Sequence, residues 1–208
     1  RERELVGIYL SAHPLDEYAV ILKHVCNVQM AELNDLTPLQ NRDLVMGGIV
    51  TGVREGQTKK GNPFGIAKVE DYSGSTEFAF FGSDWAEKKS FFNTGMFLYM
   101  KGKCQPKQWR QDEFEVKVNS IELLPEVKDK IIEKLTITAP LSVVDEEMIE
   151  ELDALIKAHP GNAELCFNIQ DEEGQMYINM MSRTLKIAVH KEIMSYLDEH
   201  PLLSSKIN

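Results

Sequence analysis

Two short polar stretches of the sequence carry the side chains whose chemistry is easiest to interpret. One reads REGQTKKG and the other PKQWRQD, and each combines cations with residues that favour turns. Lysine and arginine neutralise phosphates and release counterions, and an exposed aromatic ring stacks on an unpaired base. Contact with a single nucleic-acid strand is therefore predicted for Arg54, Lys59 and Lys60 in the first stretch and for Lys107, Trp109 and Arg110 in the second.

Plainer interpretations of these residues stay open. The two lysines also suit an ordinary solvated turn, and core packing accounts for some of the phenylalanines that follow. Strand alternation puts Phe78 and Phe80 on one face and Phe81 on the other, and one of these faces is the interior. Phe64 remains a candidate base contact. Trp109 is the preferred stacking residue, because burying an indole within a polar loop would be awkward.

The elements around these stretches predict a small barrel. Strands are expected at residues 44–55, 64–71, 75–82, 96–105 and 113–124, with a short helix at 83–92. Three strands, a helix and two strands are the order of an OB-fold, a five-stranded Greek-key barrel. In that fold the loop between strands one and two and the loop between strands four and five border a binding groove. Both basic stretches fall in these loops.

The flanking segments differ from the barrel. Residues 1–43 are expected as a helical lead-in and linker, broken at His13 and Pro14. The barrel is assigned to residues 44–125, and residues 134–208 to a small α+β domain of order βαβββα. In that domain Asp145 caps the first helix, LKIAV is a separate strand and PLLSSKIN is a frayed tail. The fold class is mixed: an OB-fold barrel followed by a small α+β domain.

Charge is distributed unevenly along the chain. The net charge is -10, but residues 44–124 hold 11 basic and 10 acidic side chains. Residues 1–43 hold 4 against 7, and residues 125–208 hold 8 against 16. The acidity therefore lies in the flanks, and a nearly neutral barrel is compatible with nucleic-acid binding without requiring it.

Cysteine usage and hydropathy favour a cytoplasmic location. Cys26, Cys104 and Cys166 are odd in number and far apart, which argues against a disulfide framework or a structural zinc site and suits small buried hydrophobes. No stretch approaches the roughly 20 apolar residues of a membrane span, and the start lacks a signal-peptide pattern. Because the sequence does not begin with Met, we expect a fragment or a processed product.

Enzyme chemistry finds little support. The histidines fall in the predicted helical flanks or at helix ends, and HxxxH, GxSxG and P-loop patterns are absent from the sequence. No catalytic residue, metal or cofactor is predicted. The acidic run from Asp145 to Glu151 is interpreted as a solvated helix face, with docking of a basic partner left open.

Longer segments resemble a known family. LVGIYLSAHPLDEY resembles the segment LGxYLxxHPLxxY in the α subunit of bacterial DNA polymerase III, the replicative polymerase. The barrel segment resembles that family's OB-fold, with GIAKVED departing where many members carry methionine. The matching residues there are Thr58, Lys59, Lys60, Gly61, Glu70, Asp71 and Gly74. The resemblance covers essentially the whole chain; it is strong from Leu5 to Phe81, and beyond the barrel it rests on element order.

The resemblance implies a non-catalytic accessory region of a DNA-directed DNA polymerase, a nucleotidyltransferase whose metal-binding aspartates lie upstream. It implies that the barrel binds single-stranded template DNA, that the final domain docks the τ subunit of the clamp loader, and that the rest of the polymerase chain is a partner. Core packing competes with docking for most of the apolar residues considered as partner contacts. These residues are Ile187, Met194, Leu197, Leu202 and Leu203.

Two other functions remain as alternatives. A barrel of this type also binds tRNA anticodons in class II aminoacyl-tRNA synthetases, although that function explains neither the HPL segment nor the acidic final domain. The barrel could also serve purely as a protein-interaction scaffold, since a fold does not determine a function.

Overall fold

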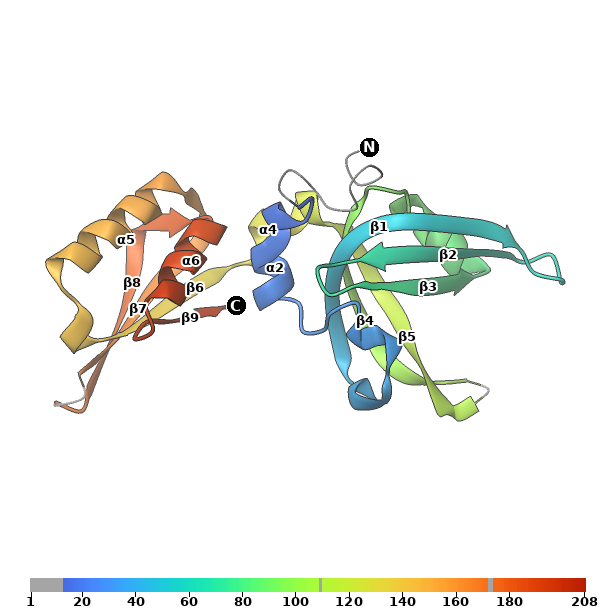
Figure 1. The fold of residues 1–208 in the computed structure, drawn as a ribbon, viewed down its shortest axis with the longest axis horizontal. Coiled ribbons are helices and arrows are strands. Elements are labelled where there is room, and N and C mark those ends of the chain that lie inside the picture. Colours follow the sequence, from blue (N-terminus) through green and yellow to red (C-terminus); the bar gives the residue numbers. More distant parts are fainter. Residues whose placement is uncertain (1–12, 109, 172–173) are drawn as a thin grey trace. The chain divides into compact units, whose positions relative to one another are not determined.

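The computed structural model describes residues 13–108, 110–171 and 174–208, and the chain divides into two compact units (Figure 1). The division falls between Glu126 and Val127, except that Lys23–Val25 group with the second unit. The helical piece expected before His13 lies outside the described residues.

The first unit is an antiparallel five-stranded sheet in the order β3-β2-β1-β4-β5. Its strands are β1 (Asp43–Gln57), β2 (Pro63–Glu70), β3 (Ser75–Phe81), β4 (Phe97–Lys107) and β5 (Arg110–Leu123). The first half of β1 pairs with β4 and the second half with β2. A register shift between Val50 and Gly52 marks the change, and such bulges bend a strand. The predicted OB-fold order is confirmed.

The helix between β3 and β4 fills the barrel core with an aromatic side chain. α3 (Ser83–Lys88) continues into the 3-10 helix η4 (Lys89–Phe91). Trp85 of α3 is buried, and its ring stacks with those of Phe80 and Phe92 at centroid distances of 6.3 and 6.0 Å. A Cβ atom on Gly65 would lie 2.4 Å from the Trp85 ring, so β2 needs glycine where the indole packs.

The segment before β1 joins the same core. It contains η1 (Asp16–Tyr18), α2 (Ala19–His24), η2 (Glu32–Asn34) and η3 (Thr37–Leu39). Between α2 and β1, Val28, Met30, Leu33 and Leu39 pack into the barrel's hydrophobic cluster. The Asp71 carboxylate accepts hydrogen bonds from the backbone N–H groups of Met30 (2.9 Å) and Ser73 (2.8 Å). Asp71 therefore ties the turn between β2 and β3 to the lead-in segment.

The second unit is a four-stranded sheet in the order β8-β7-β6-β9 with two main helices. Its elements are β6 (Lys134–Pro140), η5 (Leu141–Val143), α5 (Glu146–Ala158), β7 (Pro160–Asp171), β8 (Met176–Ile187), α6 (Lys191–Glu199) and β9 (Ser204–Ile207). β6 and β7 are parallel and α5 connects them, whereas the other pairs are antiparallel. The expected cap is confirmed, because Asp145 Oδ1 accepts a hydrogen bond from the Met148 N–H (2.9 Å).

Two expectations for this unit were wrong, and one helix at its start was missed. LKIAV is not a separate strand, because β8 runs without a break from Met176 to Ile187. PLLSSKIN is not frayed, because β9 pairs with β6 and so satisfies the backbone groups of that edge. The helix α4 (Leu124–Ile131) was not predicted. Pro125 in its first turn was the available signal, because proline is tolerated at a helix start.

Burial of the cysteines follows the sequence expectation for two of the three. Cys104 and Cys166 are buried, and Cys26 is partly buried. Across the described residues, the model contains no helix with both the length and the apolar character needed to cross a membrane.

Two neighbouring phenylalanines provide a matched test of the barrel. Phe80 is buried and Phe81 is 58% exposed. Replacing Phe80 with alanine removes a large buried side chain and should lower the free energy of unfolding by about 3–5 kcal/mol. Phe81→Ala should change it by no more than about 0.5 kcal/mol. Urea denaturation followed by tryptophan fluorescence measures both, and equal losses would contradict this assignment of the faces.

Candidate nucleic-acid interface

Two phenylalanines lie side by side on the outer face of β2 and β3. Phe64 pairs directly with Phe81, and their ring centroids are 6.2 Å apart. Phe81 is largely exposed, whereas Phe78 and Phe80 on the opposite face of β3 are buried. The alternation expected along β3 is therefore confirmed, and the interior is the face with Phe78 and Phe80. An aromatic pair with one exposed and one half-buried ring offers a stacking platform for bases.

A tight turn joins β1 to β2 and carries Lys59 and Lys60. The Gly61 N–H donates to the Thr58 carbonyl (2.8 Å), and the Asn62 N–H donates to Thr58 Oγ1 (3.1 Å). Gly61 has φ of +80°, a conformation that glycine adopts without steric cost. Both lysine side chains are exposed, and neither forms an ion pair within the described part of the chain. Their charges are therefore available to bind an anion.

The cations between β4 and β5 are held by one carboxylate. Glu113 accepts from Lys107 Nζ (2.7 Å) and from Arg110 Nη1 (2.5 Å). These hydrogen bonds, that from Lys107 above all, lower the pKa of Glu113 below its ordinary value. The carboxylate stays ionised at neutral pH, so it offsets part of the positive charge of this loop.

Phe81 is the point at which the two basic loops converge. One shallow hollow is lined by Lys59, Lys60 and Phe81, among others. A second is lined by Phe81 together with Lys107 and Arg110. A single exposed aromatic ring is thus flanked on two sides by cations, which is the combination that a single strand requires: a base stacks on the ring while its phosphates meet the charges.

Two predicted residues do not join this group. Arg54 lies on β1 and donates from Nη2 to both carboxylate oxygens of Glu77, at 3.2 and 3.1 Å. It lines neither hollow. Trp109 lies outside the described residues. Phe81, in contrast, was not predicted to contact a base, although alternation had already placed it on the face opposite Phe78 and Phe80.

The apolar residues considered as partner contacts are mostly in the core. Ile187, Met194, Leu197 and Leu203 are buried, so they stabilise the second unit and cannot meet a partner directly. Leu202 is 62% exposed and can therefore contact a partner. Apolar spacing on a helix predicts which face is buried but does not say what buries it.

A different apolar surface is exposed on β8, an edge strand of the second sheet. Successive residues of a strand point to opposite faces, and consecutive apolar residues of β8 are exposed, so both faces are open. The exposed side chains are Met176, Tyr177, Ile178, Met180, Met181 and Leu185. The segment MYINMM, in which only Asn179 is polar, was the available signal, because a strand with one solvated face would alternate apolar and polar residues.

Two family models match this chain. Residues 135–208 match the model described as DNA polymerase III alpha subunit, C-terminal domain. Residues 44–124 match the model described as OB-fold nucleic acid binding domain.

Curated relatives and a solved structure extend these matches. Two proteins called DNA polymerase III subunit alpha, from Saccharopolyspora erythraea and Haemophilus influenzae, are 26% and 27% identical over 83% and 77% of the chain. The chain spans only 15% and 14% of their lengths. The second OB-fold domain of replication protein A from Methanococcus maripaludis is 14% identical over 43% of this chain and 92% of its own, with a TM-score of 0.28.

Proposed function

Because the chain belongs to the DNA polymerase III alpha-subunit family, as its C-terminal region, we propose that its first unit binds single-stranded template DNA as a non-catalytic accessory of the polymerase. The observation that carries this proposal is the exposed Phe81 ring between two basic loops. Phe64 and Phe81 stack on bases, Lys59 and Lys60 meet phosphates on one side, and Lys107 and Arg110 meet them on the other.

The aromatic pair favours a single strand over a duplex. Bases in a duplex are stacked on each other, so a protein ring on a sheet surface reaches only bases that are unpaired. At the end of the outer face of β2 and β3, Phe64 pairs with Phe81, and neither side chain can hydrogen-bond to a base edge. Stacking of this kind is tolerant of sequence, which suits a site that accepts any template.

The ion pairs set the expected salt dependence. Lys59 and Lys60 can neutralise phosphates at once, whereas Lys107 and Arg110 must first leave Glu113. Exposed ion pairs are worth about 0–1 kcal/mol, so a phosphate can replace the carboxylate at little cost. Four phosphate contacts give a slope of log K against log salt of about -3 on a single strand.

The second unit has a surface suited to protein docking, and we assign to it the τ subunit of the clamp loader. Among the described residues, β8 is an edge strand whose outer backbone edge pairs with no other strand, and it carries apolar side chains on both faces. An extended segment of a partner can add to such an edge by backbone hydrogen bonds while its side chains pack on the apolar ones. The observation that favours this function is therefore the exposed run Met176–Met181.

Base stacking and phosphate contact can be separated by mutation. Phe81→Ala should weaken binding of labelled oligo-dT by about 1–3 kcal/mol and leave the salt slope unchanged. Replacing Lys59 and Lys60 with glutamine should instead reduce the slope by about 1.4. Fluorescence anisotropy at several salt concentrations measures both, with a duplex of equal length as the weaker ligand. Trp109→Ala tests the sequence-based prediction for that residue in the same assay.

No binding to oligo-dT even at low salt would refute the single-strand proposal and favour the scaffold alternative. Wild-type affinity of Phe81→Ala would remove the stacking role of that ring. Tighter binding of a tRNA anticodon stem-loop than of DNA would favour the anticodon alternative.

The ion pairs of Glu113 provide a second test. Glu113→Gln removes the carboxylate that competes with phosphates for Lys107 and Arg110, so we expect tighter oligo-dT binding while the slope stays near about -3, because the number of phosphate contacts is unchanged. Glu122→Gln is the matched control, because Glu122 is an exposed glutamate on the same strand and the change in net charge is identical. Equal gains in the two variants would show a general charge effect and contradict the specific role of Glu113.

The docking assignment is tested on β8. Met181→Glu places a charge on a side chain that is 59% exposed and should weaken τ binding by at least about tenfold. Ile149→Glu is the control, because Ile149 is similarly exposed, at 55%, but lies on the helix α5 and is not part of the β8 edge. Surface plasmon resonance with immobilised τ measures both. Unchanged τ binding by Met181→Glu would contradict the assignment. If only Leu202→Glu loses τ binding, the docking surface lies at Leu202 and not on β8.

A further inference from the structure

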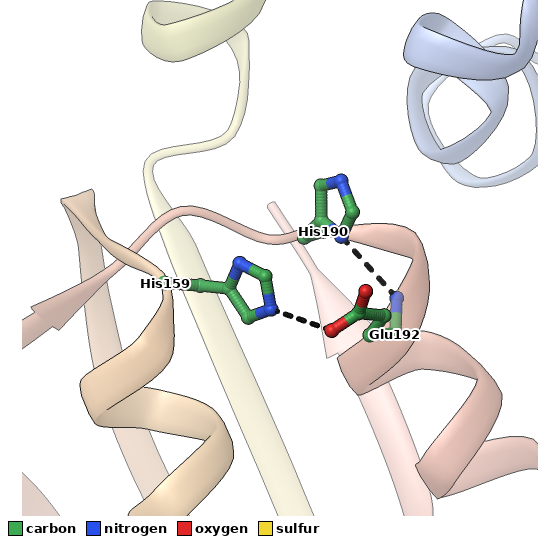
Figure 2. Close-up of side chains that lie close together, drawn as sticks. All are labelled: His159, His190 and Glu192. Carbon is green, nitrogen blue, oxygen red and sulfur yellow. Dashed lines mark hydrogen bonds and ion pairs between the residues drawn. The ribbon is translucent and has the colours of Figure 1, made fainter.

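Three side chains that commonly bind metals meet where α5 ends and α6 begins. His159 follows the last residue of α5, His190 is the N-cap of α6 and Glu192 lies in the first turn of α6. Figure 2 shows one ring nitrogen of His159 directed at the Glu192 carboxylate and one ring nitrogen of His190 directed at the Glu192 backbone nitrogen. Their potential ligand atoms all lie within 4.8 Å of one another.

Backbone pairing brings these residues together from distant parts of the sequence. The Ala188 N–H donates to the His159 carbonyl (2.9 Å), and Pro160 pairs with Ile187 across β7 and β8. His159 is only 20% exposed at its side chain, so its ring is held by packing. The position of the His159 ring is therefore set by the fold of the second unit and does not depend on a bound metal ion.

The distances are close to those that one metal ion requires. His159 Nε2 and Glu192 Oε2 are 2.9 Å apart, and two ligands of a tetrahedral zinc ion lie about 3.3 Å apart. The His159 and His190 rings are stacked, with centroids 4.7 Å apart and planes 14° from parallel. His190 is the side chain that must move to bring all three ligand atoms to metal-binding distance. It is free to do so, because it is exposed and its Nδ1 accepts only a long hydrogen bond (3.5 Å) from the Glu192 N–H.

We propose that His159, His190 and Glu192 bind one divalent transition-metal ion of the zinc type. Two imidazoles and a carboxylate are a common ligand set for zinc, and they leave a fourth position for water or a partner's ligand. Imidazole nitrogen disfavours magnesium and calcium, which take oxygen ligands. The ion replaces the proton that His159 and Glu192 share, and that proton leaves to solvent. Binding ties the end of α5 to the start of α6.

The test is a calorimetric titration of the untagged 208-residue chain with zinc chloride after treatment with a chelator. We expect one zinc ion per chain and no magnesium binding. His190→Ala and Glu192→Gln change exposed side chains, and each should weaken zinc binding by at least about tenfold. His200→Ala is the matched control, because His200 belongs to the same unit and lies outside the cluster, so its affinity should equal that of the wild type.

Histidine side-chain NMR gives an independent readout that does not rely on the stability of a variant. Zinc should shift the ring resonances of His159 and His190 and leave those of His200 in place. No zinc binding by the wild-type chain would overturn the proposal. Wild-type affinity in both His190→Ala and Glu192→Gln would also overturn it, and the cluster would then be an ion pair beside a helix cap.

Discussion

The alternation of side chains along β2 and β3 determines where each candidate base contact points. Phe80 is fixed inside the barrel by Trp85 and Phe92, so its neighbour Phe81 must face outward. A shift of one residue in the register would reverse both positions and remove the aromatic platform. The close fit of Trp85 against Gly65 holds that register from within. The interface therefore depends on the core beneath it.

The proposed DNA site lies on an acidic chain, and several of the cations in the barrel are paired locally with carboxylates. Arg54 is held by Glu77, and Lys107 and Arg110 are held by Glu113. These pairs are exposed and exchange their partners at little cost in free energy. They lower the net charge of the surface around them, and in the proposed complex a phosphate takes the place of a carboxylate. Net charge alone is therefore a poor guide to this site.

The sequence was sufficient to predict the structural features that depend on short-range residue patterns. Strand periodicity located all five barrel strands, and the position of Asp145 predicted its helix cap. It missed β9 because the partner strand β6 is distant in sequence and the tail has no apolar period of its own. It could not tell which face of β3 is interior, because alternation gives two faces and only packing chooses between them. For the same reason Met194 and Leu197 were candidate contacts although the structure buries them.

The two edges of the second sheet differ in a way that bears on its function. Of the two edge strands, β9 has only four residues, whereas β8 has twelve and carries exposed apolar side chains on both faces. Such an edge is a template for unwanted pairing, and proteins usually shorten or charge it. The C-terminal end of β8 is anchored, since Ala188 bonds to His159, while the apolar run lies at its other end. In the proposed docking, an anchored strand loses little entropy on pairing, so most of the hydrogen-bond and packing energy that β8 offers contributes to binding.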